Sequence, residues 1–160
     1  MRHVDWDEIR KECGFREDSE NREFEVAISF AGENRKLAKY IASQLELIDV
    51  PVFFDEYYES NYLGKAWSKE FERIFVRDSR LVVCILDSNH KDKIWPTFER
   101  DCFKKRVPAE DVIPIYLDDT VFVGIPDDIV GIKYKWDDSN PDWQKEVEDK
   151  IVFKIWERLE

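Results

Sequence analysis

The sequence predicts an α/β domain in which helices cover both faces of a parallel β-sheet. Two observations lead to this fold class. Short runs with strand periodicity alternate with longer runs of helical periodicity along the 160-residue chain. The run Leu81–Leu86 is apolar at every position, which is typical of a strand buried on both faces of a parallel sheet. Strands that alternate with helices predict right-handed βαβ units.

The first two predicted strands flank an amphipathic helix. Residues 1–22 are highly charged and lack a regular apolar pattern, so we interpret them as an N-terminal extension of a domain covering residues 23–160. Apolar residues alternate over 24–30, which predicts a strand that ends in a turn. Apolar residues recur every four positions over 35–48, which predicts a helix, and a short second strand follows at 52–54.

The middle of the chain predicts a long loop and two further helices. Residues 56–66 have no clear period and contain a glycine, so we expect a loop there. Aromatic and aliphatic residues over 67–75 predict a helix that precedes the buried strand. Residues 87–93 are polar and are expected to form a loop. Pro96 suits the first turn of a helix, which we expect to continue to about residue 106.

Two more strands and a closing helix complete the domain. Apolar residues predict strands at 112–117 and 132–136. Five strands joined in this way favour the flavodoxin-like order 2-1-3-4-5. The closing helix has apolar residues four positions apart, at Trp143, Val147, Ile151, Ile155 and Leu159.

The composition argues against several classes of protein. Hydrophobic residues make up 43% of the chain and charged residues 38%, which is typical of a globular domain and not of a disordered chain. The net charge of -11 argues against binding to nucleic acid or to an anionic membrane. No apolar run is long enough for a membrane span, and no signal peptide is expected. Cys13, Cys84 and Cys102 are too widely spaced for a disulfide framework or a zinc site, so a reducing cytoplasm is the expected location.

The predicted topology also predicts where a ligand would bind. In the order 2-1-3-4-5 the chain reverses direction between strands 1 and 3, and ligands bind beyond the carboxyl ends of the strands at this switch point. Residues 29–35 and 87–99 lead away from those two ends, and Asp55 follows strand 2 alongside. We therefore expect these three segments to meet in one cleft.

Those segments carry motifs that resemble a known family. The stretch 24–35, Phe-Glu-Val-Ala-Ile-Ser-Phe-Ala-Gly-Glu-Asn-Arg, resembles the first signature of Toll/interleukin-1 receptor (TIR) domains. Val-Phe-Phe-Asp at 52–55, with Leu-Gly-Lys-Ala-Trp at 63–67, resembles their second strand and mobile BB loop. Asp-Ser-Asn-His at 87–90, followed by Ile-Trp-Pro-Thr-Phe-Glu at 94–99, resembles the bacterial pattern Ser-x-x-[Tyr/His]-x-x-x-x-Trp-x-x-x-Glu.

The resemblance implies an NAD⁺ nucleosidase with the TIR fold. In enzymatic members the Glu four residues after the Trp is catalytic, which implies that Glu99 is the catalytic residue here. The first loop has a single Arg35 where enzymatic animal relatives have two adjacent arginines. The residues implied as contacts for NAD⁺ are Ser29, Phe30, Arg35, Asp55, Lys65, Trp67, Ser88 and Trp95.

The chemistry is compatible with a single carboxylate. Cleavage of the nicotinamide–ribose bond passes through an oxocarbenium-like cation, which a carboxylate near the ribose stabilises. Nicotinamide leaves as a neutral molecule, so neither a metal nor a cofactor other than NAD⁺ itself, as substrate, is expected. Trp95 offers a flat face to the nicotinamide or ribose. Arg35 and Lys65 are placed to meet the pyrophosphate, and Asp55 to accept a hydrogen bond from a ribose hydroxyl.

Each of these side chains also has an ordinary structural explanation. A helix dipole favours an acid such as Glu99 in the first turn. Trp95 and Trp67 suit a hydrophobic core, and Asp55 suits the end of a strand. His90 is expected at the surface.

Two other functions remain as alternatives to the enzyme. A non-catalytic TIR adaptor would act through TIR–TIR assembly and would not need Glu99. A phosphoacceptor receiver domain has the same strand order and would use Asp87. It would also need an acidic pair after strand 1 and a Lys after strand 5, where this chain has Ser29-Phe30-Ala31 and Trp136-Asp137.

The resemblance also suggests a biological setting. A short TIR protein of this kind resembles the signal-producing TIR subunits of bacterial Thoeris-type anti-phage systems. In such systems the TIR enzyme makes an ADP-ribose derivative that activates a separately encoded effector. The implied partners are therefore NAD⁺, other TIR subunits that assemble on activation, and that effector.

Overall fold

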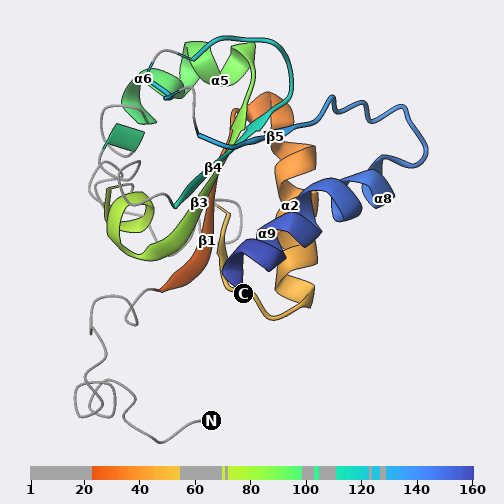
Figure 1. Ribbon diagram of the computed structural model, residues 1–160, viewed down its shortest axis with the longest axis horizontal. Coiled ribbons are helices and arrows are strands. Elements are labelled where there is room, and N and C mark those ends of the chain that lie inside the picture. The colour runs from red at the N-terminus through yellow and green to blue at the C-terminus, as the bar shows by residue number, and fades with distance from the viewer. Residues whose placement is uncertain are drawn as a thin grey trace, which may run out of the picture.

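A five-stranded parallel sheet forms the centre of the computed structural model (Figure 1), which describes residues 23–54, 70, 72–98, 103–104, 111–122, 124–126 and 129–160. The strand order is β2-β1-β3-β4-β5, and every pair is parallel. This confirms the predicted α/β class and strand order. The strands are β1 (Phe24–Ser29), β2 (Val52–Phe53), β3 (Ser79–Leu86), β4 (Val112–Tyr116) and β5 (Ile132–Lys133).

The helices lie on both faces of this sheet. In Figure 1, α2, α8 and α9 gather on one side of the strands, whereas α5 and α6 lie apart from them. The helical elements are η1 (Gly32–Asn34), α2 (Arg35–Leu47), the π-helix η3 (Arg73–Arg77), α5 (Ser88–Lys93), α6 (Trp95–Phe98), α8 (Trp143–Val147), the π-helix η6 (Glu148–Val152) and α9 (Phe153–Leu159).

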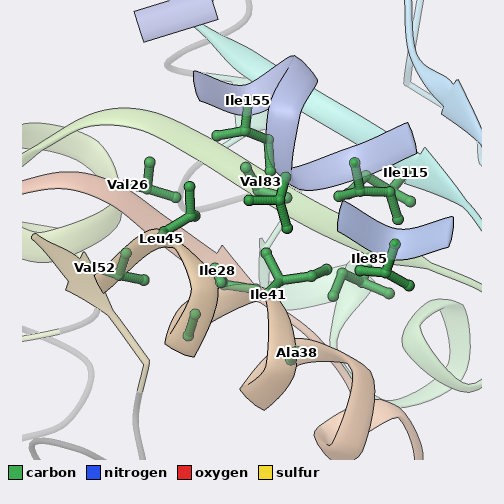
Figure 2. Packing of buried hydrophobic residues seen from close by; sticks show 14 of the residues in the cluster. Val26, Ile28, Ala38, Ile41, Leu45, Val52, Val83, Ile85, Ile115 and Ile155 are labelled. Carbon is green, nitrogen blue, oxygen red and sulfur yellow. The ribbon is translucent and has the colours of Figure 1, made fainter. Parts of the chain in front are cut away.

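The central strand β3 contributes side chains to two separate cores. Leu81, Val83 and Ile85 pack into a cluster under α2 and the closing helix. Figure 2 shows this cluster, which we call the aliphatic cluster because Val, Ile, Leu and Ala predominate in it. The alternate residues of β3, including Val82 and Cys84, pack into a second cluster on the other face. We call that one the aromatic cluster because phenylalanines and a tryptophan surround the β3 side chains. The prediction that this strand is buried on both faces is confirmed.

A π-helical segment explains the spacing of apolar residues in the closing helix. The residues of its predicted stripe are all buried, as expected. A spacing of four residues exceeds the roughly 3.6 residues per turn of an α-helix, so the stripe would rotate around a purely α-helical segment. The wider i→i+5 turn at η6, between α8 and α9, offsets this rotation and keeps the stripe facing the sheet.

The structure corrects one predicted element and shortens others. Residues 88–93, expected as loop, form α5, because Asp87 caps the segment and supplies the helix start that apolar periodicity does not reveal. β5 ends at Lys133, earlier than predicted, because only two of its residues pair with β4. Across the described part of the chain, no helix combines the length and apolar character needed to span a bilayer.

Candidate active site

The sheet register brings the predicted ligand-binding segments to one edge. Ser29, the last residue of β1, pairs with Cys84 in β3, and Leu86 at the end of β3 pairs with Tyr116 in β4. The chain segments after β1 and after β3 therefore leave the sheet side by side at the switch point.

Phe30, which follows β1, and Phe54, which follows β2, form an aromatic platform beneath the Arg35 guanidinium. The rings of Phe30 and Phe54 stack with their centroids 5.2 Å apart and their planes at 15°. The guanidinium carbon of Arg35 lies 5.2 Å from the Phe30 ring centroid and 5.9 Å from that of Phe54. Cation–π contact of this kind orients a guanidinium against the aromatic faces. The structure thus places two of the predicted NAD⁺ contacts, Phe30 and Arg35, together beyond β1.

Asp87 begins the segment after β3 and holds it to the loop after β1. Its side chain caps α5 by accepting a hydrogen bond from the His90 backbone N–H, at 3.0 Å. The other carboxylate oxygen accepts a hydrogen bond from the Asn34 amide, at 2.8 Å. Asp87 and Asn34 are both buried. One carboxylate therefore starts the helix and joins it to η1.

Two further contacts join the same segments. The Ser29 Oγ and His90 Nε2 atoms lie 3.0 Å apart, a hydrogen bond between two buried side chains. At the surface, the Lys93 ammonium forms an ion pair with Glu33. The hydrogen bond from Lys93 lowers the pKa of Glu33. α5 is therefore joined along its length to the segment 29–34.

The prediction that His90 lies at the surface is wrong. Its side chain is 0% exposed, and its ring contacts those of Trp95, Phe98 and Phe122 at centroid distances of 6.0, 5.8 and 6.2 Å. Burial lowers the pKa of His90 to about 4, although the nearby Asp87 charge acts in the opposite direction. The imidazole is therefore neutral near pH 7.

Trp95 is buried instead of presenting a flat face to a ligand. It is only 5% exposed, and its ring packs against Phe98, Phe103 and Phe122 as well as against His90. The structure therefore favours the ordinary explanation of Trp95, which is that it anchors α6 in the aromatic cluster. Stacking of Trp95 on NAD⁺ would require that packing to open.

Ser88 lies at the exposed start of α5. Its backbone N–H donates a hydrogen bond to Asp118 Oδ2 at 3.2 Å. Burial acts to raise the pKa of Asp118, but hydrogen bonds from Thr120 and Ser88 outweigh it and the pKa is lowered. The contact between the Ser88 hydroxyl and NAD⁺ stays a prediction.

The remaining candidate residues lie outside the described part of the chain. They are Asp55, Lys65, Trp67 and Glu99, so their predicted roles stay predictions. Glu99 directly follows Phe98, the last residue of α6, which is fully buried in the aromatic cluster. Within the ranges that the structure describes, no group of three or more His, Cys, Asp or Glu side chains could hold a metal ion.

The residues that hold these segments together are not evident from the sequence alone. No local pattern distinguishes Asn34, Asp87 is associated with the third motif and with a possible phosphoacceptor, and His90 is expected at the surface. One signal for Asp87 is present, since an Asp directly after an apolar strand often caps the next helix. A lone His among polar neighbours gives no such signal, because its hydrogen-bond partner, Ser29, is 61 positions away in the sequence.

Comparison with known families agrees with this architecture. A model of the TIR domain matches residues 26–152, which is most of the chain. The chain belongs to the TIR domain family. The match begins in β1 and ends in η6, so it includes the five strands and both segments at the switch point.

A curated relative adds an activity to compare with. This TIR chain is 34% identical over 106 residues to the 3' cyclic ADP-D-ribose synthase AaTIR of Aquimarina amphilecti. The match covers 64% of this chain and 32% of the relative, so this chain matches about a third of the length of that protein.

Proposed function

We propose that this TIR domain cleaves the nicotinamide–ribose bond of NAD⁺, with Glu99 as the catalytic residue. The observation that carries the proposal is the pair of buried links at the switch point. They join the segment that holds Phe30 and Arg35 to the helices that lead to Glu99. Similarity to a cyclic ADP-ribose synthase supports the same reaction class.

The two segments supply complementary chemistry. Arg35, stacked over Phe30 and Phe54, offers a positive charge to the pyrophosphate of NAD⁺. The carboxylate of Glu99 stabilises the positive charge that develops on the ribose as the bond to nicotinamide breaks. Neutral nicotinamide leaves with the bonding electron pair, so one carboxylate is sufficient.

The product depends on which group attacks the ribosyl cation. Attack by water gives ADP-ribose, whereas attack by a hydroxyl of the same molecule gives a cyclic product. The relative is named for a cyclic ADP-ribose, so we propose a cyclic product here. We further propose that this product is a signal in anti-phage defence, sensed by a separately encoded effector, and that TIR–TIR assembly activates the enzyme.

The test is to incubate the purified chain with NAD⁺, with and without a crowding agent, and to follow nicotinamide by chromatography and mass spectrometry. Glu99→Gln keeps the size of the side chain and removes its charge. The matched control is Asp92→Asn, which removes an exposed carboxylate from α5. We expect the rate with Glu99→Gln to fall by at least about a thousandfold, the scale for losing the main electrostatic stabiliser of a transition state. Asp92→Asn should keep the wild-type rate.

The co-product identifies the attacking group, since a cyclic ADP-ribose is lighter than ADP-ribose by one water. Nicotinamide release that survives in folded Glu99→Gln would contradict the assignment of Glu99. A folded wild type that releases no nicotinamide in either condition would favour the adaptor over the enzyme.

A further inference from the structure

The buried Ser29–His90 hydrogen bond connects two parts of the candidate active site that are far apart in the sequence. Ser29 ends β1, one residue before Phe30 of the aromatic platform. His90 lies in α5, and the 3.0 Å contact between Ser29 Oγ and His90 Nε2 excludes water, since both side chains are buried. A hydrogen bond in such surroundings has a narrow range of geometry, so it fixes α5 against the end of β1.

The same imidazole ring also contacts α6. The His90 ring lies nearly perpendicular to the Phe98 ring, at 83° and a centroid distance of 5.8 Å, and it also contacts Trp95. Both aromatic residues belong to α6, whose last described residue, Phe98, directly precedes Glu99 in the sequence. The backbone continues this connection, because Ile94 N–H donates to the His90 carbonyl and Phe98 N–H donates to the Ile94 carbonyl.

We propose that His90 is a positioning residue for NAD⁺ cleavage. It fixes the helix that leads to Glu99 relative to the segment that carries Phe30 and Arg35. Ser29 then acts through His90 and does not contact NAD⁺ itself. This inference rests on the proposed function, since it assigns a role in that reaction.

Burying a polar imidazole costs free energy, which argues that a ring nitrogen of His90 makes a hydrogen bond with a role in the structure. The core around His90 is aromatic, and a phenylalanine would fill a similar but slightly larger space without a polar atom. His90 Nδ1 is buried and has no hydrogen-bond partner among the described residues, which lowers the stability of the folded state. What distinguishes histidine from phenylalanine here is the Nε2 contact with Ser29.

The neutral state of His90 keeps the link intact over the physiological range. Its surroundings are Ser29 from β1, Asp87 at the start of its own helix, and the rings of Trp95, Phe98 and Phe122. Asp87 carries the only charge among these groups. With its pKa at about 4, the imidazole stays neutral well below pH 7, so the link works as a fixed support and not as a pH switch.

Two substitutions separate the hydrogen bond from the ring packing. His90→Phe keeps an aromatic ring in the cluster and removes the bond to Ser29. His90→Gln removes the ring and offers an amide nitrogen near the position of Nε2. We expect kcat for NAD⁺ cleavage to fall about 10- to 100-fold in His90→Phe with little change in KM, because small displacements of a reacting group cost this much. His90→Gln should retain most of kcat.

Ser29→Ala tests whether the two residues act through each other. It should lower kcat as His90→Phe does, and the double variant should be no worse than either single variant, because both remove the same contact. A second readout is independent of activity. Backbone amide exchange at Ile94 and Phe98 should quicken in His90→Phe and in Ser29→Ala, but not in His90→Gln.

The opposite pattern, in which His90→Gln loses kcat and His90→Phe keeps it, would overturn the proposal in favour of ring packing alone. Additive losses in the double variant would overturn it as well. Absence of NAD⁺ cleavage by the wild type would overturn the proposed function, and the catalytic part of the inference with it. The exchange measurement would still decide in that case whether the Ser29–His90 link holds α5 and α6 in place.

Discussion

The two faces of the sheet are packed with different chemistry. On one face, α2 and the closing helix cover a cluster in which aliphatic side chains interdigitate with those of β1 and β3 (Figure 2). On the other face, α5, α6 and η3 cover a cluster built around aromatic rings, with a buried imidazole at its edge. The polar links that join the candidate site converge on this second face.

The difference places the buried polar links of the candidate site on the aromatic side of the sheet, whereas Phe30 and Phe54 of its platform pack with the aliphatic cluster. Aliphatic side chains pack without polar requirements, so the first face can stabilise the sheet with few constraints on geometry. Buried polar groups require defined partners at defined distances, as with Asp87, Asn34, Ser29 and His90. Reacting groups must be held in defined positions by contacts of this kind. We therefore infer that the aromatic cluster and these four buried polar residues hold the segment that leads to Glu99, which we call the catalytic segment.

The largest expected effect on stability and activity comes from truncating one buried residue on each face of the sheet. Ile41 in α2 and Phe98 in α6 are both 0% exposed. Ile41→Ala should lower the free energy of unfolding by about 2–5 kcal/mol and Phe98→Ala by about 3–5 kcal/mol, since each leaves a cavity. Only Phe98→Ala should also lower the NAD⁺-cleaving activity per folded molecule, because Phe98 supports the helix that leads to Glu99. Chemical denaturation and kcat, corrected for the folded fraction, measure both effects.

Ile41→Val and Phe98→Leu, which remove fewer atoms at the same positions, serve as milder controls. Equal losses of activity per folded molecule in Ile41→Ala and Phe98→Ala would show that both faces support the catalytic segment equally.

The second expected effect is a dependence of stability on pH that originates on the aromatic face. Burial lowers the pKa of His90 from 6.5 to about 4 in the folded protein, and the unfolded chain has the ordinary value. Between these two values the unfolded state binds the extra proton, so stability falls as the pH falls from 6.5 to 4. The loss contributed by His90 is about 3 kcal/mol, and it is absent above pH 6.5.

The measurement is the free energy of unfolding at several pH values for the wild type, His90→Phe and His90→Gln. Neither variant titrates at this position, so both curves should be flatter than that of the wild type between pH 4 and 6.5. Carboxylates with a lowered pKa, such as Asp118, contribute their own acid sensitivity equally to all three proteins. A wild-type curve parallel to those of both variants would contradict a buried neutral His90.

The sequence predicted the aliphatic face far better than the aromatic face. The helix at 35–48 and the closing stripe were predictable because local periodicity alone places apolar residues on one side. The strand order followed from the number and type of the elements. The start of α5 was missed because its signal is one capping side chain and not a repeated pattern.

The candidate site was predictable only at the level of segments. Topology alone brings residues 29–35 and 87–99 together, and the structure bears this out for the described residues between them. Pairing of Ser29 with His90, burial of Trp95 and the double contact of Asp87 depend on distances between distant residues. No local pattern encodes those distances, so these roles required the structure.

The smallest expected effect returns to the aliphatic face, where one polar contact joins two helices. The Tyr40 hydroxyl in α2 donates a hydrogen bond to Glu148 in η6, and the Tyr40 ring packs edge-on against Trp143 at a centroid distance of 5.2 Å. Burial, with the Glu148 charge, raises the pKa of Tyr40 to about 12. Tyr40→Phe keeps the ring contact and removes only the hydroxyl.

We expect Tyr40→Phe to lower the free energy of unfolding by at most about 1 kcal/mol, because Glu148 is exposed and water replaces the lost donor. The rate of nicotinamide release should not change. Thermal unfolding and the NAD⁺ assay on one preparation measure both quantities. Unchanged stability with a lower kcat would mean that the π-helical segment η6 affects the active site across the sheet. The position of the catalytic segment would then depend on packing on both faces of the sheet, beyond the contribution of Phe30 and Phe54 to the platform.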